Sequence, residues 1–187
     1  LWNKDDTGTS KREIDFHRFV LFVEHKFTDN IKLFSEIEIE HVVASSEDKG
    51  EVELEQAFIN FQYKNNHHVL AGLFLLPVGF INETHEPPSF YGVERNSVEK
   101  YILPTTWWEA GVMFKGNITQ ELSYDAAIHS GLNTDASSNY EIRNGRQKAM
   151  EAQARGFGIT TRISYKPIAG LDLNLALQYQ TDLTQNS

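Results

Sequence analysis

The chain has 187 residues, a formal net charge of −9 at pH 7, and 40 % hydrophobic and 12 % aromatic residues, enough for one folded domain. No cysteine occurs, which excludes disulfides and thiolate metal sites, and the acidic balance without a basic stripe argues against nucleic acid as a partner. No apolar run approaches the roughly 20 residues of a membrane helix, whereas a membrane strand needs only about 9–11 residues with one apolar face.

The first 30 residues combine a polar lead-in with one alternating strand. Residues 1–13 favour turns and carry no signal-peptide pattern, so we expect any export signal to lie upstream or to have been removed. Residues 14–28 predict a strand with an apolar face and a charged face. The apolar face holds Phe19, Leu21, Val23 and Phe27, and the charged face holds Arg18, Glu24 and Lys26. Asp29 and Asn30 then predict a tight turn.

The next segment, residues 31–42, shows the clearest alternation in the chain, with Glu36, Glu38 and Glu40 on one face. Three carboxylates on one strand face are typical of the polar side of an antiparallel sheet. A catalytic carboxylate pair or a metal site would need partners from other elements. Two further strands are predicted at 52–63 and 69–76, and the apolar run of the second leaves its facing undecided.

A long irregular excursion, at about 81–105, follows this fourth strand. Pro77 and Gly79 end the strand before it, and Pro104 precedes the strand after it. An insertion of this length in a compact domain is usually functional or disordered. Its apolar residues give it more packing surface than a solvated linker has: Ile81, Phe90, Tyr91, Val93, Val98, Tyr101, Ile102 and Leu103. We therefore expect it to pack on the inner wall of a barrel.

Four more alternating strands follow, at 108–115, 122–130, 159–165 and 171–180. In the last strand the outer face is Leu171, Leu173, Leu175, Leu177 and Tyr179, and the inner face is Asp172, Asn174, Ala176, Gln178 and Gln180. A second long polar segment, 131–156, separates the strands at 122–130 and 159–165. Its Ala, Met, Glu, Gln and Lys residues predict one helical turn at 147–154.

The links between the eight predicted strands alternate in length. Short links lie near Asp29, Asn65, Asn117 and Ala169, and long links follow the second, fourth and sixth strands. In an up-and-down meander, alternate links lie at the same end, so one rim has tight turns and the other has long loops. Outer-membrane barrels have this asymmetry, and they have aromatic residues near strand ends, as at Trp107 and Trp108. The pattern predicts an all-β, antiparallel, up-and-down transmembrane β-barrel.

Four short motifs surround the excursion: LPVGF at 76–80, FYGVERN at 90–96, ILP at 102–104 and WWEAGVMFKG at 107–116. Together with ELEQAFINFQY at 53–63 and IRNGRQK at 142–148, they resemble the phosphate-selective (polyphosphate) porin family of bacterial outer membranes. The resemblance implies a sixteen-stranded, homotrimeric barrel in a Gram-negative outer membrane. This chain, residues 1–187, would be a single partial domain of about eight strands, because open edges cannot stand unpaired in lipid. Closure as a small eight-stranded barrel is the alternative.

The resemblance also implies that a loop at about 80–105 folds into a water-filled channel for passive diffusion of small ions and hydrophilic solutes, with a preference for anions such as phosphate. The candidates at the constriction are Arg95, Lys100, Glu94 and Glu99. The candidates that face the lumen are Arg18, Lys26, Glu36, Glu38, Glu40, Glu109, Lys115 and Arg162. We expect the glutamate row to lower anion entry and Arg95 to meet the passing solute. Two interpretations remain: the charges select solutes, or opposite charges pair across strands and hold loop and wall together.

No enzyme activity, cofactor or metal site is expected from the motifs. The seven histidines have no ligand spacing such as HExxH, so we expect them to be solvated or interfacial. No GxSxG, phosphate-cradling glycine loop or Rossmann fingerprint occurs. The alternatives are a small closed outer-membrane barrel with a hydrolase or adhesin role, its serine and histidine drawn from Ser123, His129 and Ser130, and a soluble β-sandwich binding module.

Overall fold

A computed structural model of the chain describes residues 2–4, 10–12, 14, 16–41, 50–92 and 95–186. Its main element is one antiparallel sheet of eight strands in the order β10-β9-β8-β7-β6-β5-β4-β3, so each strand pairs with its neighbours in the chain. The predicted all-β, up-and-down meander is confirmed. A separate antiparallel pair, β1 (Trp2–Lys4) and β2 (Ser10–Arg12), precedes it.

The strands of the main sheet contain 8 to 13 residues. They are β3 (Arg18–Lys26), β4 (Ile31–Glu40), β5 (Val52–Lys64), β6 (His67–Leu75), β7 (Trp108–Asn117), β8 (Leu122–His129), β9 (Gly158–Ile168) and β10 (Leu171–Tyr179). Short helical segments occur in the long links: η1 (Pro87–Ser89), η2 (Val98–Ile102), η3 (Ala136–Ser138) and α1 (Ile142–Gly145). No helix in the described residues has the length and apolarity needed to cross a membrane.

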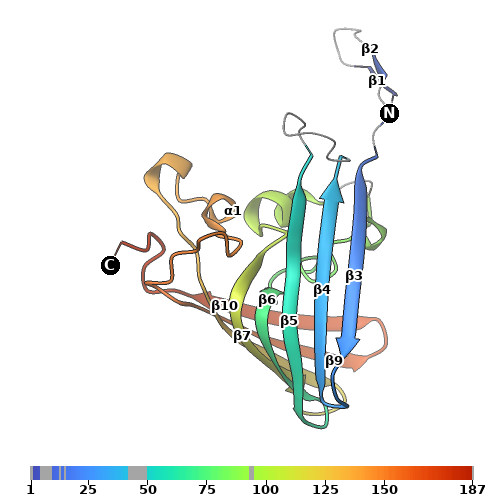
Figure 1. Cartoon of the computed structure of the whole chain (residues 1–187), viewed down its shortest axis with the longest axis vertical. Helices are drawn as coiled ribbons and strands as arrows, with labels where there is room; N and C mark the ends of the chain where they lie inside the picture. Colours follow the sequence, from blue (N-terminus) through green and yellow to red (C-terminus); the bar gives the residue numbers. More distant parts are fainter. Residues whose placement is uncertain are drawn as a thin grey trace.

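Short and long links alternate, as predicted. The short links are residues 27–30, 65–66, 118–121 and 169–170, and the long links are 41–51, 76–107 and 130–157. At the first tight link, Thr28 Oγ1 accepts hydrogen bonds from the backbone N–H groups of Asn30 and Ile31, which closes the turn between β3 and β4. Figure 1 shows this turn and the β5–β6 turn at the lower end of the sheet.

The two faces of the sheet carry different side chains. The outer face is exposed and apolar along most strands: Phe19, Leu21, Val23, Ile59, Phe61, Val112, Phe114, Ile128, Ile159, Ile163, Leu173, Leu175 and Leu177. The inner face carries apolar side chains such as Phe34 and Phe58, together with buried polar ones: Glu36, Glu38, Glu109, Asp125, His129, Thr160 and Ser164. A compact apolar cluster on this inner side, which includes Phe74, Trp107 and Met113, packs where the long link 76–107 joins the sheet. The predicted period-two alternation therefore holds along the strands, except where the register shifts in β5.

The sheet is strongly curved but open. In Figure 1, β9 and β10 run across the direction of β3, β4 and β5, so the sheet wraps partly around its inner face. β3 and β10 are its two edges and do not pair with each other. Closure as an eight-stranded barrel is therefore absent from the described residues, and the transmembrane barrel of the prediction is here an open eight-stranded sheet.

The predicted helical turn at 147–154 is wrong. The helical segments of this link are η3 and α1, which both lie earlier in the chain. Lys148, Ala149 and Glu151 have positive φ angles, between 49° and 57°, and the right-handed helix needs negative φ. The Gln147 side chain explains the difference, because its amide bonds the backbone carbonyls of Gly131 and Gln153 and accepts from Gln153 N–H. Contacts with distant residues outweigh local helix propensity here.

Candidate functional site

The long link between β6 and β7, residues 76–107, lies across the inner face of the sheet; we call it the β6–β7 loop. Its Glu83 carboxylate pairs with Arg162 of β9, which also holds Asp125 of β8. Its Glu86 lies 4.0 Å from Arg18 of β3, measured from Oε2 to Nη1. The loop thus contacts strands near both edges of the curved sheet, and Figure 1 shows it behind β4 and β5.

Asn82 fixes the base of this loop. Its Nδ2 donates to the carbonyl of Leu76 at 2.7 Å and to that of Trp107 at 2.9 Å, and its Oδ1 accepts from Trp107 N–H at 2.7 Å. The amide side chain therefore substitutes for a backbone peptide just beyond the β6–β7 ladder. Because Asn82 is buried, with 2 % of its surface exposed, these bonds are shielded from water.

Glu99, a predicted constriction residue, is buried inside the loop. Its Oε1 accepts from Phe80 N–H at 2.9 Å, and its Oε2 accepts from Thr105 Oγ1 at 3.3 Å. Gly79, with φ of +66°, lets the backbone pass close to this carboxylate, because a Cβ there would lie 2.5 Å from Glu99 Oε2. The side chain holds the two ends of the loop together and does not face an open pathway. Glu94 lies outside the described residues.

Three arginines converge on backbone carbonyls at the end of the loop; we call Arg95, Arg143 and Arg146 the arginine cluster. Arg95 Nη1 donates to the Thr105 carbonyl at 2.9 Å, and Arg143 Nη1 donates to the same oxygen at 3.0 Å. Arg146 donates to the carbonyl of Thr106. In the part of the chain that the structure describes, no carboxylate forms an ion pair with these three side chains. Burial, and then repulsion from neighbouring arginines, lowers the pKa of Arg95 and of Arg146.

A cavity of about 250 Å³ opens beside this cluster. It is lined by His17, Arg18, Pro87, Phe90, Arg95, Lys100 and Arg143. Two predicted constriction residues, Arg95 and Lys100, therefore share one cavity with Arg18, although Arg18 lies on β3. None of the described residues that line it is acidic, so their fixed charges favour an anion.

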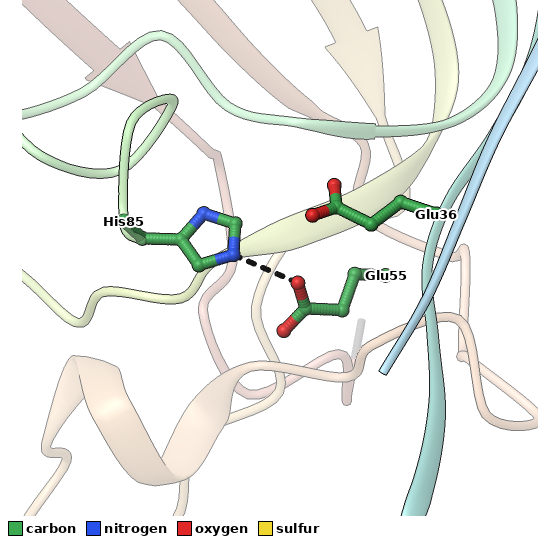
Figure 2. A group of neighbouring side chains, drawn as sticks. All are labelled: Glu36, Glu55 and His85. Atoms are coloured by element: carbon green, nitrogen blue, oxygen red, sulfur yellow. Dashed lines mark hydrogen bonds and ion pairs between the residues drawn. The ribbon is translucent and has the colours of Figure 1, made fainter. Parts of the chain in front are cut away.

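Acidic side chains and one histidine gather on the other side of Arg18. We call Glu36, Glu38, Glu55, His85 and Glu86 the Glu–His cluster. Glu36, Glu38, Glu55 and His85 each have 2 % of their surface exposed. His85 Nε2 lies 2.8 Å from Glu55 Oε2, and Figure 2 shows the Glu36 and Glu55 carboxylates beside its ring. Arg18 Nε lies 2.9 Å from Glu38 Oε1, which links this cluster to the basic cavity.

A β-bulge in β5 places Glu55 in this cluster. Glu36 pairs with Gln56 and the next residue, Ile37, pairs with Leu54, so Glu55 is the extra residue. Glu55 is not among the residues predicted from the sequence to line the site. A signal for it exists, because the apolar positions of this strand shift from Val52 and Leu54 to Ala57 and Ile59. The expectation that the histidines are solvated or interfacial is wrong for His129, which is 1 % exposed, and for His85, which the β6–β7 loop buries against this bulge.

The other predicted lumen residues with a basic side chain form ion pairs, either on the inner face of the sheet or beside a tight turn at its end. Arg18 bonds Glu40 at 2.9 Å across β3 and β4. Lys115 lies 3.5 Å from Asp125, the residue that also holds Arg162. Lys26 differs, because it is exposed and pairs with Asp29 of the adjacent turn at 2.6 Å. These contacts are those expected if opposite charges hold loop and wall together.

Glu109 is fully buried in a separate polar network at the base of the link 130–157. It accepts from Trp107 Nε1 at 3.1 Å, from Ser130 Oγ at 2.5 Å and from Gln147 N–H at 3.2 Å. His129 Nε2 lies 2.9 Å from Thr160 Oγ1, so the histidine and serine considered for a hydrolase bond different partners. This network fastens the link at residues 130–157 to the sheet.

The fold and its inner site define an all-β protein with one eight-stranded antiparallel meander and a long loop across its inner face. No family model matches the chain. A protein of Aquifex aeolicus (strain VF5), named "Uncharacterized protein", is 37 % identical over 157 residues, which are 82 % of this chain and 36 % of the relative. The chain thus spans about a third of the length of that relative.

Proposed function

We propose that the chain is part of an outer-membrane porin, a water-filled channel through which small ions and hydrophilic solutes diffuse passively. The observation that carries this proposal is the division of one sheet into an exposed apolar face and a buried, charged face crossed by a loop. Exposed apolar surface costs about 25 cal/mol per Å² in water, and lipid contact removes that cost. Strands of 8 to 13 residues also suit the roughly 9–11 residues that a tilted membrane strand needs.

The open edges of the sheet support a larger barrel. Unpaired backbone N–H and C=O groups on β3 and β10 would each cost several kcal/mol in hydrocarbon. We therefore propose that further strands pair with both edges, in a sixteen-stranded barrel that forms a homotrimer. The relative from Aquifex aeolicus is long enough to contain such further strands, because the segment that matches this chain is 36 % of its length.

The basic cavity supports an anion preference in this channel. Arg95, Lys100 and Arg143 line it without carboxylate partners among the described residues, and a guanidinium suits planar or tetrahedral oxyanions. The Glu–His cluster opposes this preference, but Arg18 neutralises part of it. We propose that small anions, phosphate among them, pass along the basic side of the inner face.

Reconstitution in a planar lipid bilayer tests the channel proposal. We expect discrete conductance steps, together with a reversal potential in a KCl gradient that shows chloride to be the more permeant ion. Detergent dependence of the purified protein separates the membrane barrel from the soluble sandwich, and an ester-hydrolysis assay tests the hydrolase alternative. Folded, membrane-inserted protein that conducts no ions would overturn the proposal.

A further inference from the structure

We propose that the Glu–His cluster is a binding site for a divalent transition-metal cation, with Zn²⁺ as its test ion, which fastens the β6–β7 loop to the strands beneath it. One ligand atom each from Glu36, Glu55 and His85 lie within 4.8 Å of one another. The same holds for Glu38, His85 and Glu86. The donors come from β4, β5 and the loop, so an ion among them would join three elements that are far apart in the sequence.

The hydrogen bonding of His85 favours a metal ligand. Its Nδ1 lies 3.1 Å from the Asn82 carbonyl, an acceptor, so Nδ1 carries a proton and donates it there. Its Nε2 faces the Glu55 carboxylate at 2.8 Å, with the Glu86 carboxylate at 3.6 Å. Both ring nitrogens thus face oxygen atoms, so a proton between Nε2 and Glu55, or a cation on Nε2, is needed. A backbone carbonyl on the opposite nitrogen is the arrangement that orients metal-binding histidines.

A second observation is independent of His85. The Glu38 side chain is 3 % exposed, and no hydrogen-bond donor among the described residues reaches its Oε2. Glu86 Oε1 is also buried without a donor. A buried carboxylate oxygen without a donor is costly, because it has lost water and gained nothing in return. A cation between these oxygens and His85 would remove that cost.

The charge of the cluster also favours a cation. Glu36, Glu38, Glu55 and Glu86 bring four carboxyl groups together, and among the lysines and arginines of the described residues Arg18 is the one that pairs with them. Arg18 also pairs with Glu40, so its one positive charge is divided between Glu40 and the carboxyl groups of the cluster. Burying several carboxylates beside one guanidinium requires protons or another cation to offset their repulsion.

The donor atoms suit zinc or a similar ion. Imidazole with carboxylates is typical of Zn²⁺ and neighbouring transition metals, whereas Ca²⁺ takes six to eight oxygen ligands. Two ligands about 2.1 Å from one tetrahedral ion are about 3.4 Å apart. The His85–Glu55 atoms, 2.8 Å apart, would separate by about 0.6 Å, and atoms 4.8 Å apart would approach by about 1.4 Å.

Metal titration of the intact, EDTA-treated protein in detergent tests the site. We expect one Zn²⁺ per chain by calorimetry, and a Co²⁺ visible spectrum typical of a low-coordinate site with nitrogen and oxygen ligands. His85→Gln and Glu55→Gln should each weaken Zn²⁺ binding by more than about tenfold, since even outer-shell changes act on that scale. His68→Gln is the matched control, because His68 bonds Asn60 and no carboxylate.

Metal titration needs no channel activity, so the metal site can be confirmed or refuted independently of the porin proposal. The Co²⁺ spectrum also needs no variant, which keeps the test valid if a substitution disturbs folding. Absence of stoichiometric Zn²⁺ binding, a Co²⁺ spectrum of an all-oxygen octahedral site, or equal loss of affinity in His68→Gln and His85→Gln would each overturn the site.

Discussion

His85 Nε2 lies 2.8 Å from Glu55 Oε2, and both side chains are 3 % exposed although 30 residues separate them in the sequence. This contact joins the β6–β7 loop to the bulge of β5. A buried bond between a histidine and a carboxylate is stronger than an exposed one, because water does not compete for either group. This pair therefore adds a buried contact to those of Asn82 and Glu83 that hold the loop over the inner face.

The first prediction concerns pH in metal-free protein. Burial by itself lowers the pKa of His85, but the hydrogen bond and charge of Glu55, with Glu36, outweigh burial and raise it above 6.5. A raised pKa in the folded state contributes stability below pH 6.5, and this contribution is lost as pH rises through the raised value. With EDTA present, we expect the thermal midpoint of the unmodified protein to approach that of His85→Gln as pH rises. A constant gap between the two across this range would contradict the prediction.

The second prediction concerns Gly79→Ala. The backbone at Gly79 has φ of +66°, and a Cβ would lie 2.5 Å from Glu99 Oε2. The substitution adds left-handed strain of about 1–2 kcal/mol and pushes Glu99 away from Phe80 N–H, at about 1 kcal/mol more. We expect a loss of about 2–3 kcal/mol in the free energy of unfolding, measured by denaturant titration in detergent.

Gly170→Ala is the control for this substitution. Gly170 has φ of +83° but nothing within 4 Å of its ideal Cβ position, so it reports the backbone strain without the contact. The difference between the two variants isolates the Glu99 contribution. Equal destabilisation by both would show that the Gly79–Glu99 approach has no energetic weight.

The strand faces could be predicted from the sequence, because side chains in a strand alternate with a period of two. The last strand illustrates this, since Leu173, Leu175 and Leu177 lie on the outer face as expected. Trp108 belongs to the outer face by its position in the strand, but unlike those three leucines it is buried. It is 3 % exposed, and Lys148 of the link 130–157 lies over its ring, 4.4 Å from the centroid. Such a contact between distant segments has no local sequence signal.

The Glu–His cluster could be predicted only in part. The face shared by Glu36 and Glu38 followed from alternation within β4. Glu55 was missed because a bulge reverses the facing of one half of β5, and His85 was missed because loop positions have no periodicity. Three-dimensional contact between a loop and a bulge depends on the curvature of the whole sheet, which no local pattern encodes.

The third prediction concerns the lipid-facing surface. Asn174 and Leu175 are adjacent on β10, exposed, and point to opposite faces of the sheet. The chain has no native cysteine, so single substitutions report one position each. In liposomes, a water-soluble maleimide should label Asn174→Cys at least about tenfold faster than Leu175→Cys, because lipid excludes the reagent from the outer face. The reference is the labelling rate in denaturant, where both cysteines should react equally. Equal labelling of the two cysteines in liposomes as well would rule out the membrane barrel.

The fourth prediction concerns the β6–β7 loop as the constriction. Its Glu83 and Glu86 contact strands near opposite edges of the sheet, so the loop occupies the space that a barrel would enclose. Deleting residues 86–99 should raise the single-channel conductance of the intact protein, because the narrowest section limits the current. The size of folded protein in detergent provides the control for assembly. Unchanged conductance in a correctly assembled variant would place the loop outside the ion pathway.

The last prediction concerns charge selection by Arg95. Its guanidinium lines the basic cavity, donates to the Thr105 carbonyl, and has no carboxylate partner among the described residues, so its charge acts on whatever enters. Arg95→Gln removes the charge while its amide can still donate to Thr105. We expect the reversal potential in a KCl gradient to shift toward cation permeation, and low salt to enlarge the shift because screening weakens. Lys26→Gln is the matched control, since Lys26 is exposed and paired with Asp29 at the tight-turn end. Equal shifts in both variants would mean that net charge, and not this cavity, sets the selectivity.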